Sequence, residues 1–381
     1  MTLQNRMTAQ EATNTRAVSL TVPPIRPGDM GANPLVSVLV TNYNYARFLG
    51  IAIDSVLRQT YTNFEIVVCD DGSTDNSDEL LVNYARSDSR VKVTYRSNGG
   101  QPAAMNEAYR HSSGEVICLL DADDVFEPQK LAKVVEKFRS DQDIGIVGNS
   151  VKVIDGNGDL IRTITYQEEG YLGPSIYRLR KKNITPPCSG LSFRREVLDE
   201  IFPLPEILRI AADGAIVGPA VNLSSMGIIH ESLSSWRIHG NNNAADGGSL
   251  PQLSAEWLER TLRHSEALHR HIGEFVSKKL GITYDTSGFR PVIEYRLALG
   301  ILRSDKDLVG QASANLWQAY TTKADNYSFA RLIFWQALAH LPAPLAIPLL
   351  KAAYQLHKKY LLWKQRASSQ PLERSGDISA G

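Results

Sequence analysis

Few cysteines and no excess of either charge mark this chain of 381 residues. The three cysteines, Cys69, Cys118 and Cys188, are odd in number and widely spaced, which excludes a disulfide framework and a zinc ribbon. Lysine plus arginine (41) equals aspartate plus glutamate (41), so no global field favours nucleic acid as a partner. Because the N-terminus lacks a basic stretch followed by an apolar block, we expect no secretory signal peptide and a reducing, cytoplasmic location.

The sequence also lacks an unbroken apolar run of about 20 residues, the length that crosses a membrane. Its most apolar stretch, 327–366, is interrupted by Pro342, Pro344 and Pro348, which favours two helices. The second half mixes cations with aromatic and apolar residues: Lys351, Lys358, Lys359, Lys364, Arg366, Tyr354, Leu361, Leu362 and Trp363. Two interpretations stay open, a peripheral contact with the anionic inner face of the cell membrane or a helix pair packed on the protein's own core.

The domain organisation follows from shifts in composition. With 43% hydrophobic and 22% charged residues, the chain can form a sizeable core. Residues 1–33 are rich in Thr, Asn, Pro and Gly without an apolar period, so they are predicted to form a flexible leader. The patterns become helical from about residue 244, so 244–381 is predicted as a helical C-terminal region. One large domain over 34–243 fits between them.

Short apolar runs alternate with amphipathic helical patterns over the first third of the chain. Strands are predicted at 35–40, 64–70, 91–96 and 115–120, with helices at 48–60, 78–87 and 102–112. Such alternation, with about 25 to 30 residues in each unit, is typical of βαβ units. The predicted fold class is therefore α/β, with a Rossmann-like, mostly parallel sheet flanked by helices.

Polar clusters follow three of the predicted strands, at 41–44, 70–75 and 121–124. Ligands of open α/β sheets bind beyond the carboxyl ends of the strands, so these clusters should meet in one crevice. Asp121 and Asp123 suit Mg²⁺ or Mn²⁺, which bind hard oxygen ligands and leave positions for substrate phosphates. The alternative is that Asp123 and Asp124 only cap the helix that follows.

Two longer segments decide between these interpretations. VLVTNYNYARFLGIAIDSVLRQTYTNFEIVVCDDGSTDNS and SNGGQPAAMNEAYRHSSGEVICLLDADDVFEPQKL together resemble the nucleotide-sugar-binding half of the family 2 inverting glycosyltransferases, which have the GT-A fold. The resemblance covers 36–131 and continues more weakly through SGLSFRREVL and SWRIHGNNN to about residue 243. It implies a GT-A domain with a donor half at 34–131 and an acceptor half at 132–243.

The implied activity is metal-dependent, inverting transfer of a sugar from a UDP-type nucleotide donor to a hydroxyl of a glycan or glycolipid, in cell-surface polysaccharide synthesis. The resemblance implies these donor-binding residues: Thr41, Tyr43, Asp70, Asp71, Asn106, Asp121, Asp123 and Arg237. Thr41 and Tyr43 would line the base and ribose pocket, and Asp71, beside Asp70, would accept a hydrogen bond from the base. Asp121 and Asp123 would carry Mn²⁺ or Mg²⁺.

The weaker part of the resemblance adds further roles. His239 would complete the coordination of the metal ion through a neutral ring nitrogen, and Arg237 would neutralise phosphate. Asn106 would either contact the donor or brace a loop. Many relatives carry an Arg where this chain has Met105. A basic donor contact is therefore absent or comes from elsewhere, for example from Arg96, Arg194 or Arg237.

Inversion requires a base that removes the proton of the acceptor hydroxyl. Relatives use the Asp of a Glu-Asp pair, and the residue here is Asp213, with Ala212 in the Glu position. Asp213 could equally cap the next helix. Lesser candidates are Asp199, Glu200 and Glu206.

Two other functions stay open. A nucleotidyl or phosphoryl transferase could use the same acidic site, but TNYNYARFLG contains neither GxxxxGK[ST] nor GxGxxG. A catalytically inactive nucleotide-sugar-binding protein would accommodate Met105 and Ala212.

Overall fold

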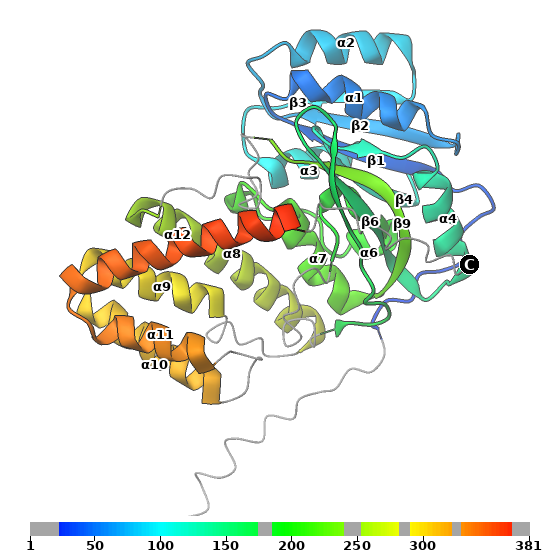
Figure 1. The fold of residues 1–381 in the computed structure, drawn as a ribbon. Helices are drawn as coiled ribbons and strands as arrows, with labels where there is room; N and C mark the ends of the chain where they lie inside the picture. Colours follow the sequence, from blue (N-terminus) through cyan, green and yellow to red (C-terminus); the bar gives the residue numbers. More distant parts are fainter. Residues whose placement is uncertain (1–22, 174–184, 240–252, 282–289, 322–328, 368–381) are drawn as a thin grey trace, which may run out of the picture.

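The computed structural model describes residues 23–173, 185–239, 253–281, 290–321 and 329–367. A nine-stranded sheet with flanking helices forms one part of the molecule, and a group of helices lies beside it (Figure 1). The strand order is β3-β2-β1-β4-β8-β6-β9-β5, and β7 pairs with β6.

The first half of the sheet is parallel, as the sequence predicts. β1 (Val36–Asn42), β2 (Phe64–Asp70), β3 (Val91–Tyr95) and β4 (Val116–Asp121) alternate with α1 (Ala46–Leu57), α2 (Ser77–Ser87) and α3 (Gln101–Arg110). The pairing register puts Thr41 beside both Cys69 and Asp121, and Asn42 beside Asp70. The polar ends of three strands therefore lie at one edge of the sheet.

Alternate residues of the central strands face two separate cores, because successive side chains of a strand point to opposite faces. Leu39 and Val67 pack with α3 and α7 (Ala212–Leu223), whereas Val38 and Val68 pack with α1 and α4 (Lys130–Ser140). Burial on both faces explains why β1 and β2 are apolar along their length.

The second half of the sheet is mixed. It contains β5 (Val125–Phe126), β6 (Ile144–Ile154), β7 (Leu160–Ile164), β8 (Leu191–Arg194) and β9 (Ser225–Arg237), with the short helices η2 (Cys188–Gly190), α6 (Arg195–Leu198) and η3 (Glu206–Leu208). β8 is antiparallel to both β4 and β6, whereas the long strands β6 and β9 are parallel. β9 also pairs with β5, which brings the end of β9 next to the acidic residues after β4.

The C-terminal region is helical, as predicted. It comprises α8 (Ala255–Leu280), α9 (Arg290–Arg303), α10 (Lys306–Thr321), α11 (Phe329–His340) and α12 (Ala343–Ala367). α10 has no counterpart in the sequence prediction. A third core cluster joins these helices, and α8 attaches them to the sheet domain by packing against α7. Within the described residues, no helix is both long and apolar enough to cross a membrane.

The predicted fold class is confirmed: an α/β fold whose mostly parallel sheet is flanked by helices and extended by a helical C-terminal region. The three cysteines are buried and unpaired, in agreement with the absence of a disulfide framework. Of the predicted leader, 1–22 lie outside the described residues. Residues 23–33 lie along the domain, where the Ile25 amide donates to the Leu223 carbonyl oxygen at 2.8 Å.

Candidate active site

A cavity of about 470 Å³ opens at the polar edge of the sheet. Six residues selected from the sequence line it together: Thr41, Tyr43, Asp71, Asp121, Asp123 and Asp213. They come from β1, the ends of β2 and β4, and the first turn of α7, so residues more than 170 positions apart in the chain meet in one space. The predicted single crevice is therefore present.

Asp71 organises one wall of the cavity. Its two carboxylate oxygens accept hydrogen bonds from the amides of Gly99 (2.9 Å) and Gly100 (2.7 Å), and Arg96 Nη1 lies 3.5 Å from Oδ1. Gly100 has a φ of 95°, and a Cβ there would lie 2.3 Å from the Arg209 carbonyl oxygen, so only glycine fits. Asp71 thus fixes the loop before α3, and each oxygen keeps a lone pair for a ligand.

Three carboxylates at the end of β4 share a buried environment: Asp121, Asp123 and Asp124, here called the acidic cluster. Burial, followed by the charges of Asp123 and Asp213, raises the pKa of Asp121 to about 7. Burial also raises the pKa of Asp123, although a hydrogen bond with His239 acts in the opposite direction. The pKa of Asp124 is raised well above its ordinary value by burial and by its two acidic neighbours. A positive charge placed among these groups would favour their ionised forms.

These carboxylates fit a divalent cation. Asp121 and Asp123 offer the hard oxygen ligands that Mg²⁺ and Mn²⁺ prefer, and their mutual repulsion is the cost that such an ion would remove. The Asp124 side chain is oriented by the Arg237 amide, which donates to Oδ1 at 2.8 Å. Within the described residues, no group of three or more His, Cys, Asp or Glu side chains is arranged to hold a metal ion.

Gln101 is a site residue that the sequence interpretation missed. Its Nε2 donates to Asp121 Oδ1 at 3.0 Å, and its Oε1 accepts from the Ala212 amide at 3.2 Å. The main-chain amide of Gln101 donates to the Arg209 carbonyl oxygen at 2.9 Å. One side chain therefore connects the acidic cluster to the start of α7. The Pro102 that follows it marks a helix start, but nothing local indicates these distant partners.

Asp213 lies at the second position of α7 and not at its N-cap, which is Ala211. Asp213 is therefore not the N-cap residue, although its carboxylate accepts a hydrogen bond from the Gly214 amide at 2.8 Å in the first turn. Burial raises the pKa of Asp213, and its side chain lines the same cavity as Asp121. Arg209 and Ala211 both have positive φ, of 41° and 57°, an unfavourable backbone conformation for such residues. The hydrogen bonds of Gln101 with Arg209 and Ala212 hold this segment in place.

Arg209 is the one cationic side chain among the described residues that line the cavity. The sequence analysis did not select Arg209, although this residue lies only four positions before Asp213, the candidate base. Met105, which stands where many relatives have Arg, is fully buried in the core. Of the suggested replacements, Arg96 pairs with Asp71 and Glu206 outside the cavity lining, and Arg194 donates to the Gly28 carbonyl oxygen.

Two of the predicted donor-binding residues brace loops. Asp70 accepts hydrogen bonds from Asn42 Nδ2 (2.7 Å) and from the Ser73 amide (2.8 Å), behind the cavity wall. Asn106 Nδ2 donates to the Leu204 carbonyl oxygen at 2.9 Å, and its Oδ1 accepts from the Leu204 amide at 2.7 Å. For Asn106 the geometry favours the bracing alternative, and its contact with the donor stays a prediction.

His239 and Arg237 lie on the other side of Asp123. His239 Nε2 is 3.0 Å from Asp123 Oδ2, and its ring packs against Tyr45 and Phe48. Arg237 Nε donates to the Asp123 carbonyl oxygen at 2.8 Å, and its side chain lines a neighbouring cavity. Their roles toward the metal and the donor phosphate remain predictions, as do the other assigned roles.

A buried lysine near the acidic cluster was also not selected by the sequence analysis. Lys130, the first residue of α4, is fully buried, and its Nζ donates to Asn149 Oδ1 (2.7 Å) and to the Ser189 carbonyl oxygen (2.8 Å). Burial lowers the pKa of Lys130 to about 8. Ser189 Oγ in turn accepts from the Asp121 amide at 3.0 Å. Lys130 is therefore linked through Ser189 to the end of β4.

Comparison with known proteins identifies the family of this chain. The family model for glycosyl transferase family 2 matches residues 37–202. An uncharacterized glycosyltransferase of Nostoc sp. is 35% identical over 309 residues, which cover 78% of this chain and 94% of that protein. The chain belongs to glycosyltransferase family 2, and the enzyme class is that of the glycosyltransferases.

Similarity to larger relatives is confined to part of their length. The hyaluronan synthase of Pasteurella multocida is 33% identical over 155 residues, 41% of this chain and 15% of that protein. The chondroitin synthase of Escherichia coli is 35% identical over 155 residues, 41% of this chain and 22% of that protein. The matches therefore span less than a quarter of these two relatives.

Proposed function

We propose that this protein transfers a sugar, with inversion, from a UDP-type nucleotide-sugar donor to a hydroxyl of a glycan or glycolipid in cell-surface polysaccharide synthesis. The observation that carries the proposal is the one cavity shared by Asp71, Asp121, Asp123 and Asp213. Family membership supports glycosyl transfer over the nucleotidyl-transferase alternative. The cavity supplies an acceptor for a base N–H, acidic groups for a cation and a buried base candidate.

The donor would lie across the cavity from Asp71 to the acidic cluster. Asp71, Thr41 and Tyr43 bind the base and ribose, and the Asp71 carboxylate accepts the uracil N3–H. Arg209 lies against the diphosphate and partly neutralises it, which replaces the basic contact absent at Met105. The sugar would then lie between the acidic cluster and α7.

Asp121 and Asp123 would hold Mn²⁺ or Mg²⁺, with His239 beside Asp123. A bound divalent ion stabilises the negative charge that develops on the leaving nucleoside diphosphate. Asp213 accepts the proton of the acceptor hydroxyl on the face of the sugar opposite the diphosphate. Its position in the first turn of α7 favours its ionised form through the helix dipole, against the effect of burial.

A donor screen tests the proposal. The purified full-length protein is incubated with UDP-glucose, UDP-galactose, UDP-N-acetylhexosamines and GDP-mannose, with and without Mn²⁺, and nucleotide release is measured. We expect Mn²⁺-dependent release of UDP that is lost in Asp123→Ala. If no donor releases its nucleotide with any acceptor, while a donor still binds tightly, the result would support the inactive binding protein instead.

We also propose a cytoplasmic location with peripheral contact to an anionic membrane. Residues 329–367 contain six Lys or Arg and no Asp or Glu. One face of α12 packs on the protein's own core through Ala346 and Leu350, while Leu345, Leu349 and Leu356 are exposed. Exposed leucines beside cations are typical of helices that lie on anionic lipid. The side chains of 357, 358 and 360–367 lie outside the described residues.

Liposome sedimentation tests this contact. The double variant Leu345→Asp/Leu349→Asp should lose co-sedimentation with phosphatidylserine-containing liposomes, because two carboxylates would have to enter the lipid interface. The control is Ile207→Asp, which changes a still more exposed apolar residue of the sheet domain. Equal sedimentation of the double variant and the unmodified protein would dismiss the membrane contact.

A further inference from the structure

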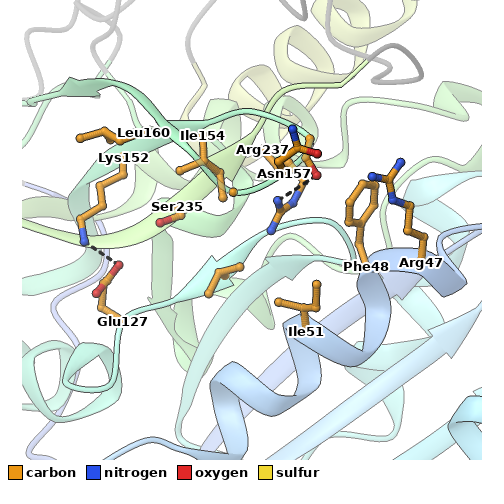
Figure 2. A pocket seen from close by; sticks show the side chains of 13 residues that line it. Arg47, Phe48, Ile51, Glu127, Lys152, Ile154, Asn157, Leu160, Ser235 and Arg237 are labelled. Carbon is orange, nitrogen blue, oxygen red and sulfur yellow. Dashed lines mark hydrogen bonds and ion pairs between the residues drawn. The ribbon is translucent and has the colours of Figure 1, made fainter.

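A second cavity, of about 730 Å³, adjoins the candidate active site between α1, β5, β6 and β9 (Figure 2). Its apolar walls are Phe48 and Ile51 of α1, Val125 of β5, Ile154 of β6 and Leu160 of β7. Its polar side chains are Arg47, Glu127, Lys152, Asn157, Ser235 and Arg237. No step of the proposed transfer uses this space.

Two guanidinium groups flank the Phe48 ring at one end of this cavity. The Cζ atoms of Arg47 and Arg237 each lie 4.9 Å from the centroid of the Phe48 ring, and Figure 2 shows the ring between the two side chains. Arg237 is buried and fixed by the carbonyl oxygens of Asp123 and Asp155, whereas Arg47 is exposed. Among the described residues, Arg47 makes no ion pair. Two cationic groups on either side of one ring make this end of the cavity favourable for an anion.

The rest of the lining suits a sugar better than a hydrocarbon chain. Ile51 and Leu160 are 45% and 62% exposed and offer apolar surface to the C–H face of a pyranose ring. Lys152 Nζ and Glu127 Oε1, 2.8 Å apart, and the Asn157 amide offer donors and acceptors for hydroxyl groups. A hydrocarbon ligand would cover these polar groups without satisfying them, which is unfavourable.

The cavity shares a wall with the acidic cluster. The His239 ring lies 5.1 Å from the Phe48 ring, centroid to centroid, and its Nε2 is 3.0 Å from Asp123 Oδ2. Arg237 reaches the Asp123 carbonyl oxygen from the same side. A molecule held by the two arginines would therefore lie next to the transfer site.

We propose that this cavity binds an acidic saccharide, as a subsite for the acceptor glycan. The carboxylate or phosphate of the saccharide contacts Arg47, and the charge of the buried Arg237 adds to the attraction. The saccharide ring packs over Ile51 and Leu160, and its hydroxyls bond to Lys152, Glu127 and Asn157. The assignment to an acceptor rests on the proposed function, whereas the binding of an acidic saccharide does not require it.

Titration calorimetry on the full-length protein tests this subsite. The probes are a hyaluronan hexasaccharide, which carries carboxylates, a glycerol phosphate trimer, which carries phosphodiesters, and neutral maltohexaose. We expect at least one acidic probe to bind at least tenfold more tightly than maltohexaose, and more weakly as salt is added. The probe that binds identifies carboxylate or phosphate as the recognised group.

Variants locate the binding. Arg47→Ala should weaken binding of the acidic probe roughly tenfold, and Arg47→Glu should weaken it further, because each removes a charge-assisted contact. The matched control Arg58→Ala removes an exposed arginine just after α1, outside the cavity lining, and should bind like the unmodified protein. An unchanged thermal midpoint in Arg47→Ala and Arg47→Glu shows that their folds are intact.

Equal affinity of Arg47→Glu and the unmodified protein for the acidic probes would overturn the inference, as would equally tight binding of maltohexaose. Turnover of a UDP-sugar by a protein that binds neither acidic probe would reject the subsite and leave the proposed function standing. Arg47-dependent binding without turnover of any nucleotide-sugar would reject the proposed function and leave the subsite standing.

Discussion

Gln101 Nε2 donates a hydrogen bond to Asp121 Oδ1 at 3.0 Å, while the other end of the same amide accepts from the first residue of α7. The segments 34–131 and 132–243 are thereby joined at the acidic cluster. Asp213, the base candidate, is the next residue of that helix. The position of the base relative to the donor therefore depends on an amide side chain that itself performs no chemistry.

Gln101→Ala should lower kcat about tenfold to a hundredfold with a smaller change in the donor KM. The loss of both hydrogen bonds lets the start of α7 move, and misplacement of a catalytic group by about 1 Å has effects of that size. Steady-state kinetics of UDP release measures both constants. The control is Gln129→Ala, at the N-cap of α4, whose side chain makes no capping bond. An unchanged kcat in Gln101→Ala would contradict the positioning role.

Asp213→Asn should lower kcat by about 10² to 10⁴ and leave donor affinity nearly unchanged, because an amide cannot accept the hydroxyl proton. Donor affinity is measured by calorimetry and kcat by transfer to acceptor. Glu200→Gln, a lesser candidate in an exposed ion pair with Lys279, serves as the control. If Glu200→Gln were the inactive variant, the assignment of the base would be wrong.

The pH dependence of transfer should follow the ionisation of Asp213. Only the carboxylate form accepts a proton, so the rate should fall as the pH falls through the pKa of this group. Because burial raises the pKa of Asp213, the fall should begin at a higher pH than for an exposed aspartate. The kcat profile with saturating donor checks this. A rate independent of pH between about 4 and 7 would argue against a buried carboxylate base.

Arg209→Ala should raise the donor KM about tenfold, with little effect on base recognition, because a charge-assisted contact to phosphate is lost. The comparison of UDP with uridine separates the two effects, since uridine has no phosphate. Arg86→Ala, an exposed arginine of α2, is the control. Equal loss of affinity for UDP and uridine would show that Arg209 acts through loop structure and not through the diphosphate.

Glu65 should contribute to stability at neutral pH. Burial alone would raise its pKa, but hydrogen bonds from Lys92, Ser37 and the Ser113 amide lower it overall. A carboxylate whose folded-state pKa is below its unfolded value stabilises the fold above that value, and the contribution is lost as the pH falls through the folded pKa. Glu65→Gln should therefore cost about 1.5–3 kcal/mol of unfolding free energy at pH 7.

Urea unfolding of Glu65→Gln at pH 7 and at acid pH measures this contribution. The difference from the unmodified protein should shrink as the pH is lowered, while Glu136→Gln, an exposed control on α4, should show no difference at either pH. A difference that stays constant with pH would mean that the charge of Glu65 is not the source of the stability.

The parallel half of the sheet could be predicted because its pattern is local. Apolar strands of about six residues, each followed by a turn and an amphipathic helix, identify βαβ units without knowledge of distant contacts. The same regularity placed Asp71, Asp121 and Asp123 at strand ends, and hence at one edge of the sheet. For these three residues, chain order and strand direction were sufficient.

Other residues around the cavity could not be predicted in this way, because they take their roles from distant partners. Gln101 and Arg209 are 108 positions apart in the sequence, yet they meet through a main-chain hydrogen bond. Lys130 follows a proline at a helix start, where a lysine is ordinarily solvated, but β6 and η2 cover it. Arg237 ends a strand next to the acidic cluster, yet its side chain extends toward the second cavity because β9 pairs with β5.

The most direct test of the central claim is anomalous diffraction from crystals grown with UDP and Mn²⁺. The account predicts one manganese peak between the Asp123 carboxylate and the diphosphate, with the uracil ring beside Asp71. Manganese bound away from Asp121 and Asp123, or UDP in the cavity beside Phe48, would contradict it.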